Sequence, residues 1–152
     1  MSAWSEHLDR LVQGRVDLPP STKNLELGTI CDWKQGYARK EWQVDSKFFT
    51  APDLGVFGGY LSALADQMMV LTAITVLEDG QIVRTTSLQI DYFRPVTSGS
   101  LIIEGRVINL SRRLVFVEIS FLNEGELAAK ARGSLFIVNR QDIDRRWKSA
   151  AD

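Results

Sequence analysis

One aspartate stands alone in the most apolar stretch of the chain. Val56 to Leu77 has Asp66 as its only formal charge. An ionised carboxylate in apolar surroundings is costly to desolvate, so we expect Asp66 to be partnered, protonated or functional. An apolar wall would raise its pKa and its basicity, which suits a general base. The alternative is a buried structural carboxylate bonded to Ser or Thr hydroxyls.

Two glycines, Gly58 and Gly59, begin this apolar stretch. A helix N-terminus carries free amides and about half a positive charge, which suits an anion or a developing oxyanion. The absence of side chains would let a reacting group come within hydrogen-bond reach. The pair could also serve only to start the helix and to allow close packing.

His7 and Cys31 are the only residues of their types, which limits the other possible chemistries. A zinc site built from such ligands is excluded in practice, and we expect no metal. Ser-His or Cys-His dyads would need His7, which we place on the surface of a short N-terminal helix. Chemistry in this chain must therefore rely on carboxylates, hydroxyls and backbone dipoles. A single cysteine also excludes an internal disulfide and suits a reducing compartment.

The composition is that of an ordinary soluble protein. The 152 residues carry a formal net charge of −1 and are 45% hydrophobic, which predicts one domain and favours neither nucleic acid nor an anionic membrane as partner. The N-terminal residues mix charges throughout and contain no apolar signal core. We expect a cytoplasmic location.

The segment from Gly59 to Leu77 is predicted to be one long central helix. Its apolar residues lie on every side, which is typical of a buried helix. At ~1.5 Å per residue it would span roughly 28 Å, nearly a bilayer core. Its glycines and threonines, with Asp66 and Gln67, argue against lipid. We expect a helix wrapped by the rest of its own protein.

The remaining segments predict strands with a helix at each end. Four strands are expected between Val83 and Val138, and small residues such as Ala129, Ala131 and Gly133 would let a helix approach the last one closely. The other expected elements are a helix over 3–13, an extended linker over 18–21, a hairpin of strands 27–33 and 37–44, and a helix over 140–150. This order predicts an α+β fold with an antiparallel sheet around the central helix.

Three segments together resemble a known family. They are GGYLSALAD from Gly58, IDYFRP from Ile90 and GELAA from Gly125. The pattern resembles the PaaI-type acyl-CoA thioesterases of the hotdog fold, over about residues 18–137. The resemblance implies a single hotdog domain over 1–152, with the terminal helices as extensions.

The resemblance also implies an activity and an assembly. Such enzymes hydrolyse a CoA thioester without any cofactor beyond the CoA of the substrate, and they form homodimers or homotetramers with the active site across a dimer interface. By resemblance, Asp66 would be the nucleophile or general base. The Gly58 amide would polarise the thioester carbonyl, and the Thr85 hydroxyl would hold the attacking water. A threonine in a strand can also be simply a strand former.

The resemblance further indicates substrate-binding residues. Arg112 occupies the turn that would lie near the CoA phosphates, and Arg94 and Arg113 could assist because Arg matches phosphate geometry. Exposed hairpin arginines are also commonly only solvated. The residues that could line an acyl pocket are Phe57, Gly59, Tyr60, Met68 and Met69, with core packing as the alternative.

Two departures from the family pattern concern the carbonyl-binding end. Phe57 stands where members have a histidine, and no asparagine lies between Phe48 and Phe57, with Ala51 near the usual position. Loss of one such donor would weaken oxyanion stabilisation by about 2–4 kcal/mol. The alternative hypothesis is therefore a catalytically weak acyl-CoA-binding hotdog protein. A hotdog hydratase would need a well-placed histidine, and His7 is poorly placed.

Overall fold

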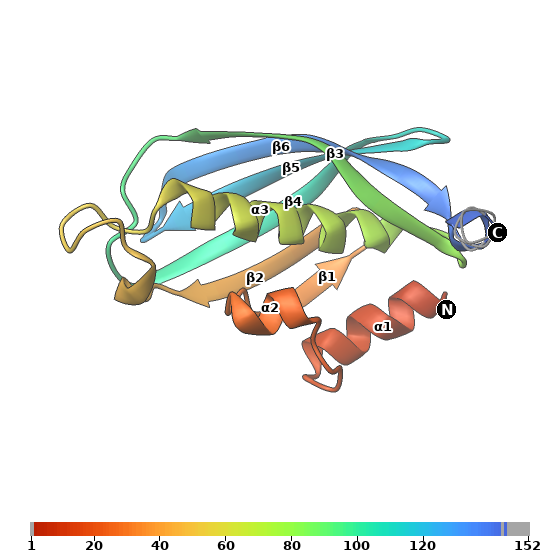
Figure 1. The fold of residues 1–152 in the computed structure, drawn as a ribbon, viewed down its shortest axis with the longest axis horizontal. Helices are drawn as coiled ribbons and strands as arrows, with labels where there is room; N and C mark the ends of the chain where they lie inside the picture. The colour runs from red at the N-terminus through yellow and green to blue at the C-terminus, as the bar shows by residue number, and fades with distance from the viewer. Residues whose placement is uncertain (1, 144, 146–152) are drawn as a thin grey trace.

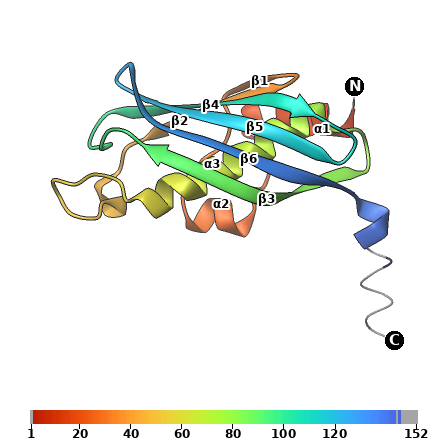
Figure 2. The same cartoon turned by 90° about the horizontal axis from the view of Figure 1, so that it is seen from above.

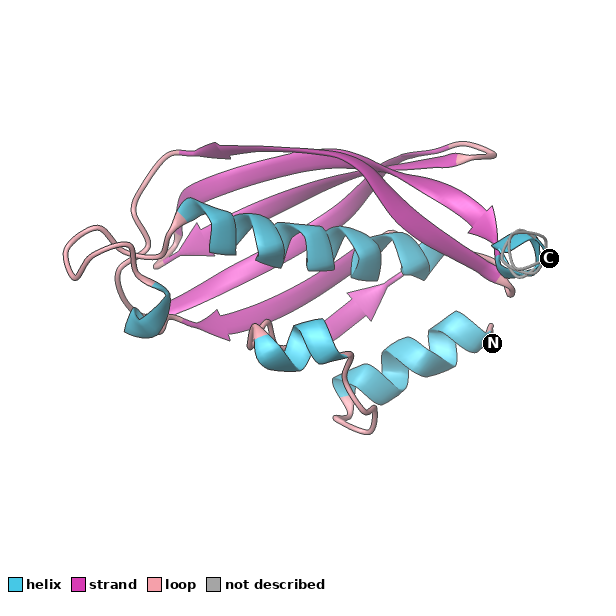
Figure 3. Cartoon of the chain, in the orientation of Figure 1, coloured by secondary structure: helices cyan, strands magenta, loops and turns pink. Residues whose placement is uncertain are grey.

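A computed structural model describes residues 2–143 and 145 of the chain (Figure 1). Six antiparallel strands form one curved sheet, and the central helix α3 lies against its concave side (Figures 1 and 3). The helices are α1 Ala3–Val12, α2 Pro20–Asn24 and α3 Gly58–Ala73, with 3-10 turns at Ser46–Phe48 and Ile74–Val76. The strands are β1 Asp32–Lys34, β2 Tyr37–Gln43, β3 Gln81–Tyr92, β4 Ser100–Leu110, β5 Leu114–Asn123 and β6 Glu126–Asn139.

The sheet has the strand order β1-β2-β4-β5-β6-β3, which confirms the predicted α+β class and antiparallel sheet. Three consecutive hairpin-linked strands, β4, β5 and β6, form its middle. The 12-residue strand β3 pairs with β6 and forms one edge, as the view from above shows (Figure 2). Within the described chain the outer side of β3 is therefore unpaired.

Glycines in the sheet allow α3 to come close to it. A Cβ on Gly105 would collide with the Thr72 side chain, and a Cβ on Gly133 would collide with the Met69 side chain and the Ser87 carbonyl. This confirms the expectation that small residues in the last strand let a helix approach. Met69 and Thr72 are fully buried at these contacts.

The central helix is not buried on every side, and that expectation is wrong. Tyr60, Leu64 and Met68 are buried, whereas Asp66 is exposed and its neighbours on the same face are only partly covered. By length and composition Gly58–Val76 could cross a membrane, and 56% of its most apolar window is buried inside this fold. The reason for the error is that one curved sheet encloses only part of a helix.

The predicted extended linker contains a short helix instead. Pro19 has the extended ψ of 153° that a residue before proline adopts, and α2 then begins at Pro20. The missing amide of proline costs nothing at the first helical position, so the second proline starts the helix rather than preventing it.

The predicted strand over 27–33 is shorter than expected, because the backbone before it turns. Glu26 and Gly28 have φ values of +51° and +68°, which interrupt an extended strand. Side chains from β2 and α3 bind the carbonyls of residues 25–28, which replaces strand hydrogen bonds. The donors are Tyr60 Oη, Trp42 Nε1, Lys40 Nζ and Gln67 Nε2.

Lys40 is a fully buried lysine within this arrangement. Its ammonium donates to the Leu27 carbonyl at 2.9 Å and to the Gln67 side-chain oxygen. Both acceptors are neutral, so burial dominates and lowers the pKa of Lys40 to about 7.

The predicted N-terminal helix is confirmed as α1, and its apolar face packs with Leu8 and Leu11 buried. Trp4 Nε1 donates to the Gln81 carbonyl at 2.9 Å, which attaches α1 to the start of β3. Helical backbone follows β6 over 140–143, and the rest of the predicted C-terminal helix lies outside the described residues.

Candidate active site

Asp66 and Thr85 form the polar pair on the open face of α3. The Thr85 hydroxyl donates to Asp66 Oδ1 at 2.7 Å, and both residues are exposed. The expectation of a carboxylate in a mostly apolar wall is therefore wrong for the single chain. The carboxylate is instead ordered by a hydroxyl and open to a reactant.

A β-bulge turns Thr85 toward the helix. The register of β3 against β6 shifts between Thr85 and Ser87, so Thr85 lies opposite Leu135 on the inner face while Ser87 faces outward. The hydroxyls of Thr86 and Ser134 lie 2.7 Å apart and those of Ser87 and Ser134 3.0 Å apart, which fixes the bulge. Bulges commonly re-aim side chains beside active sites. The hydroxyls of Thr86, Ser87 and Ser134 were not predicted from the sequence, because only the register of β3 against β6 brings them together.

The start of α3 presents unused backbone donors. The N-cap residue Phe57 offers no side-chain oxygen to the helix. In the part of the chain that the structure describes, the amides of Gly58 and Gly59 have no acceptor. A Cβ on Gly59 would lie 2.7 Å from Phe57 Cε2, so the ring lies directly over the second glycine and would have to shift if a side chain stood there. These amides are suited to an oxyanion.

A surface cavity of about 440 Å³ opens beside this helix start. Phe57 forms part of its wall with 45% of its surface exposed, and Gly58 contributes backbone. The other lining residues are Thr50, Leu54, Val56, Leu61, Tyr92, Phe93, Arg94, Pro95 and Val96. Most of these side chains are apolar in type, but polar atoms also contribute to the cavity surface, and Arg94 adds one cation at its border.

The two halves of the site are far apart along α3. Gly58 and Asp66 are eight residues apart, so at ~1.5 Å per residue the amide and the carboxylate are about 12 Å apart along the axis. A single reacting carbonyl cannot contact both groups of the same chain.

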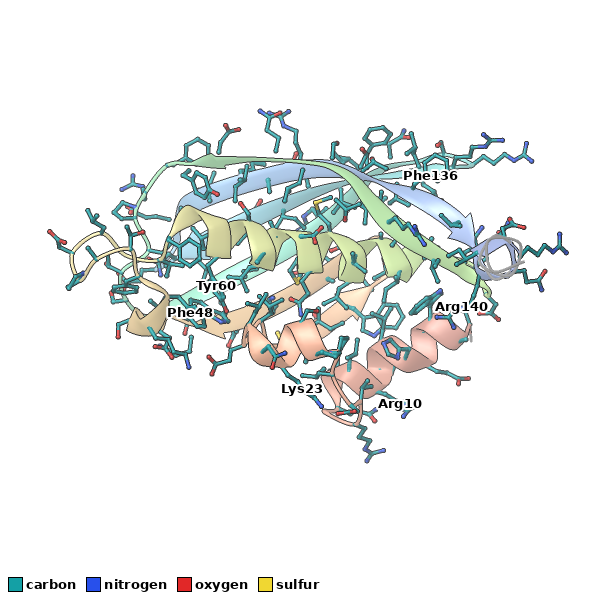
Figure 4. All side chains as sticks on the ribbon, in the orientation of Figure 1. Arg10, Lys23, Phe48, Tyr60, Phe136 and Arg140 are labelled. Atoms are coloured by element: carbon teal, nitrogen blue, oxygen red, sulfur yellow. The ribbon has the colours of Figure 1, made fainter. Side chains whose placement is uncertain are left out.

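Tyr60 and Met69 pack in the core of the single chain. Tyr60 stacks on Phe48 with ring centroids 4.0 Å apart (Figure 4), and its hydroxyl donates to the Leu25 carbonyl at 2.8 Å. Burial raises the pKa of Tyr60 to about 12. Met69 is fully buried, as is Met68, and neither Tyr60 nor Met69 lines the cavity beside Gly58. In the single chain, Tyr60 and Met69 therefore pack in the core, which was the alternative to lining an acyl pocket.

The predicted phosphate-binding arginines lie at opposite ends of the sheet. Arg94 borders the cavity and pairs with Glu126 at 2.9 Å. The backbone carbonyl of Arg113 accepts a hydrogen bond from the Ile137 amide, and Ile137 pairs with Val83 near the start of β3. From Val83 to Tyr92 the strand covers about 30 Å at ~3.3 Å per residue. One chain therefore does not bring Arg94 together with Arg113 and its neighbour Arg112.

His7 lies away from these groups on α1. The His7 ring contacts the Trp4 ring edge-on, with the ring centroids 5.7 Å apart. Burial and, to a smaller extent, the positive charge of Arg10 lower the pKa of His7. Among residues 2–143 and 145, no group of three or more His, Cys, Asp or Glu side chains could hold a metal.

Comparison with known proteins identifies the family. The model of the thioesterase superfamily matches residues 55–130, which include α3, β3 and both halves of the site. The chain belongs to the thioesterase superfamily. This confirms the resemblance to the PaaI-type thioesterases and the predicted hotdog fold.

Individual relatives agree with this assignment. A thioesterase of Haemophilus influenzae, HI1161, has a TM-score of 0.75 and 25% identity over 88% of this chain and 91% of its own. The protein smu.793 of Streptococcus mutans, solved with acetyl CoA, has a TM-score of 0.66 and 23% identity over 72% of this chain and 87% of its own. A candidate esterase of Saccharolobus solfataricus is 35% identical over 82 residues, 53% of this chain, and the match spans only 58% of that protein's length.

The departures from the superfamily pattern lie at one end of the site. Phe57, in place of the usual histidine, is the uncapped N-cap of α3 and a wall of the cavity. Ala51 is half-buried near the position of the usual asparagine. The polar groups that remain at this end are the backbone amides, because Phe57 and Ala51 are apolar.

Proposed function

We propose that this chain hydrolyses a CoA thioester. The proposal rests chiefly on one observation: an exposed carboxylate, Asp66, held by the Thr85 hydroxyl at 2.7 Å on a helix that begins with free amides. Membership of the thioesterase superfamily and the acetyl CoA bound to the Streptococcus mutans protein support it. We also propose a cytoplasmic location.

In the proposed reaction the Gly58 amide binds the thioester oxygen as it gains negative charge. Asp66 acts as a general base toward water, or attacks the carbonyl carbon itself to form an anhydride that water then hydrolyses. The C–S bond breaks in either route, and the CoA sulfur leaves and takes up a proton. The Thr85 hydroxyl orients the carboxylate and, when released, the attacking water.

The proposed site requires two copies of the chain. The 12 Å separation within one helix is removed if the Asp66 of one copy meets the Gly58 of another. The free edge of β3 offers the contact, because pairing two such edges across a two-fold axis runs the strands antiparallel and satisfies their backbone groups. We therefore propose a homodimer as the smallest active unit, within a dimer or a tetramer.

The proposed dimer would also bring together the residues expected to bind the substrate. Antiparallel pairing of β3 edges would bring Arg112 and Arg113 of one copy toward the Arg94 end of the other, where phosphates of CoA could bind. Phe57 and Gly59 would then border the acyl group in the apolar cavity.

The second candidate function is acyl-CoA binding with weak catalysis. It is favoured by Phe57, which places an aromatic ring where the superfamily pattern has a polar group at the carbonyl-binding end. A hydratase is disfavoured, because His7 contacts Trp4 on α1 and not the open face of α3.

Hydrolysis of a panel of acyl-CoAs, followed by release of free thiol, separates these functions. We expect turnover by the wild type and at least a hundredfold lower kcat for Asp66→Asn with substrate binding retained. Asp17→Asn is the control, because Asp17 is an exposed carboxylate paired with Lys23. Binding without turnover in the wild type would favour the second candidate, and an unchanged kcat in Asp66→Asn would remove Asp66 from the mechanism.

A further inference from the structure

The first turn of α3 is poorly constrained by its own residues. Gly58 and Gly59 lose more backbone freedom on ordering than any other residue type, and the N-cap Phe57 makes no side-chain bond to the turn. The proposed oxyanion donors belong to this turn, and catalysis needs donors held in place before the charge develops. Beyond the backbone bonds of the turn to the Phe57 carbonyl, a contact from outside the helix would further restrict the peptide groups of these glycines.

Tyr92 supplies that constraint from the sheet. Its hydroxyl donates to the Gly58 carbonyl at 2.7 Å and lies 2.9 Å from Ser62 Oγ. A phenol has one proton and a carbonyl only accepts, so the Ser62 hydroxyl must be the donor to Tyr92. The result is a directed chain from Ser62 to Tyr92 to Gly58, in which each bond strengthens the next.

The Tyr92 ring also packs on the backbone that it binds. A Cβ on Gly58 would lie 3.0 Å from Tyr92 Cζ, so the ring rests directly against the glycine. Tyr92 is 47% exposed and lines the cavity beside Gly58, whereas the alternation of apolar residues along β3 predicts a buried residue at this position. The difference arises because Tyr92 is the last residue of β3, where the strand extends past the core to the start of α3.

The end of β3 that carries Tyr92 is itself anchored. Tyr92 pairs with the fully buried Ala129 of β6. The following amides, of Phe93 and Arg94, both donate to the Ala128 carbonyl, at 2.8 and 3.1 Å. The hydroxyl therefore connects Gly58 to the hydrogen-bonded sheet.

We infer that Tyr92 is a positioning residue for the oxyanion-binding amides. Its hydroxyl binds the Gly58 carbonyl, which belongs to the same peptide group as the Gly59 amide, so it fixes the direction of that amide, while its ring rests against Gly58 itself. The expected effect of Tyr92 on kcat rests on the proposed function. The expected effect of Tyr92 on the order of the first turn of α3 rests on the contacts alone.

Tyr92→Phe removes the hydroxyl and keeps the ring. Because a single hydrogen bond is lost, we expect kcat for acyl-CoA hydrolysis to fall about tenfold while KM changes less than about twofold. Ser62→Ala leaves the Tyr92 to Gly58 bond and should lower kcat by less than about threefold. Tyr37→Phe is the matched control, since among the described residues the Tyr37 hydroxyl has no hydrogen-bond partner.

Amide hydrogen exchange at Tyr60 and Leu61, whose amides donate to the Phe57 carbonyl at 3.0 and 3.3 Å in this turn, can be measured by NMR on the full chain and does not depend on activity. Exchange should be at least about tenfold faster in Tyr92→Phe than in the wild type or Tyr37→Phe. Wild-type kcat in Tyr92→Phe, with only thermal stability lowered, would overturn the positioning role. If the wild type hydrolyses no acyl-CoA, the proposed function fails, and unchanged exchange at Tyr60 and Leu61 then overturns the inference separately.

Discussion

Two charged side chains close to the middle of α3 lie in opposite environments. Asp66 is exposed on the open face and bonded to Thr85, whereas Lys40 is fully buried and bonded to Gln67, the next residue along the helix. Carboxylates that react with substrate must be reachable, so exposure of Asp66 is compatible with function. The buried charge is the costly one, because its partners are neutral.

Lys40 should make folding stability depend on pH. Its pKa is about 7 in the fold and about 10.5 when unfolded, so the unfolded chain binds more protons between these values. The free energy of unfolding should therefore rise from pH 7 to pH 10, on the order of a few kcal/mol. Lys40→Met should remove this slope in urea unfolding at pH 7, 8, 9 and 10.

The control for that experiment is Lys34→Met, which removes an exposed lysine from β1. It should keep the wild-type slope. Equal slopes in the wild type and Lys40→Met would show that the buried amine is not the group responsible.

At the scale of elements, contacts with glycines set the distance between α3 and the sheet. Gly105 of β4 lies under Thr72, and Gly133 of β6 lies under Met69. The same closeness brings β3 within reach of the helix, so that Thr85 reaches Asp66 and Tyr92 reaches Gly58. Packing and site geometry therefore depend on the same few small residues.

Gly105→Ala tests this dependence. The new methyl group would overlap Thr72 Oγ1, so we expect a loss of about 1–3 kcal/mol in the free energy of unfolding, measured by urea denaturation. In the double variant with Thr72→Ala the overlap is absent, and part of the loss should be recovered. Additive effects of the two substitutions would contradict a direct contact.

At the scale of the whole molecule, the two groups of the proposed site lie at separate places in the single chain. The helix start with its cavity lies at one end of α3, and the Asp66 and Thr85 pair lies about 12 Å further along it. The open helix face and the free β3 edge lie side by side in both views (Figures 1 and 2). A second copy placed there would cover both and complete two sites.

Mixing two impaired variants tests whether sites are shared. Asp66→Asn lacks the carboxylate, and Gly58→Ala places a methyl group 3.0 Å from Tyr92 Cζ and disturbs the helix start. After unfolding and refolding together, mixed dimers should regain about a quarter of wild-type activity, because half the dimers are mixed and each has one intact site. Activity no greater than the sum of the separate variants, or a monomer by light scattering at micromolar concentration, would contradict a shared site.

The sequence by itself determined the class of fold, the family and the position of the lone carboxylate. Helix and strand periodicity, the glycine pair and the order of elements are local properties of the chain, so they can be recognised before folding. Gly133 and its small neighbours even indicated where the helix would approach the sheet.

Only the tertiary structure decided which groups face one another and which face solvent. The sheet covers part of α3, so Asp66 is exposed and Lys40 is buried, although composition favours neither outcome. The bulge that aims Thr85 and the strand end that brings Tyr92 to Gly58 join residues at least 19 positions apart in sequence. Such contacts depend on register and curvature, which are set by the packing of the whole sheet and not by any single segment.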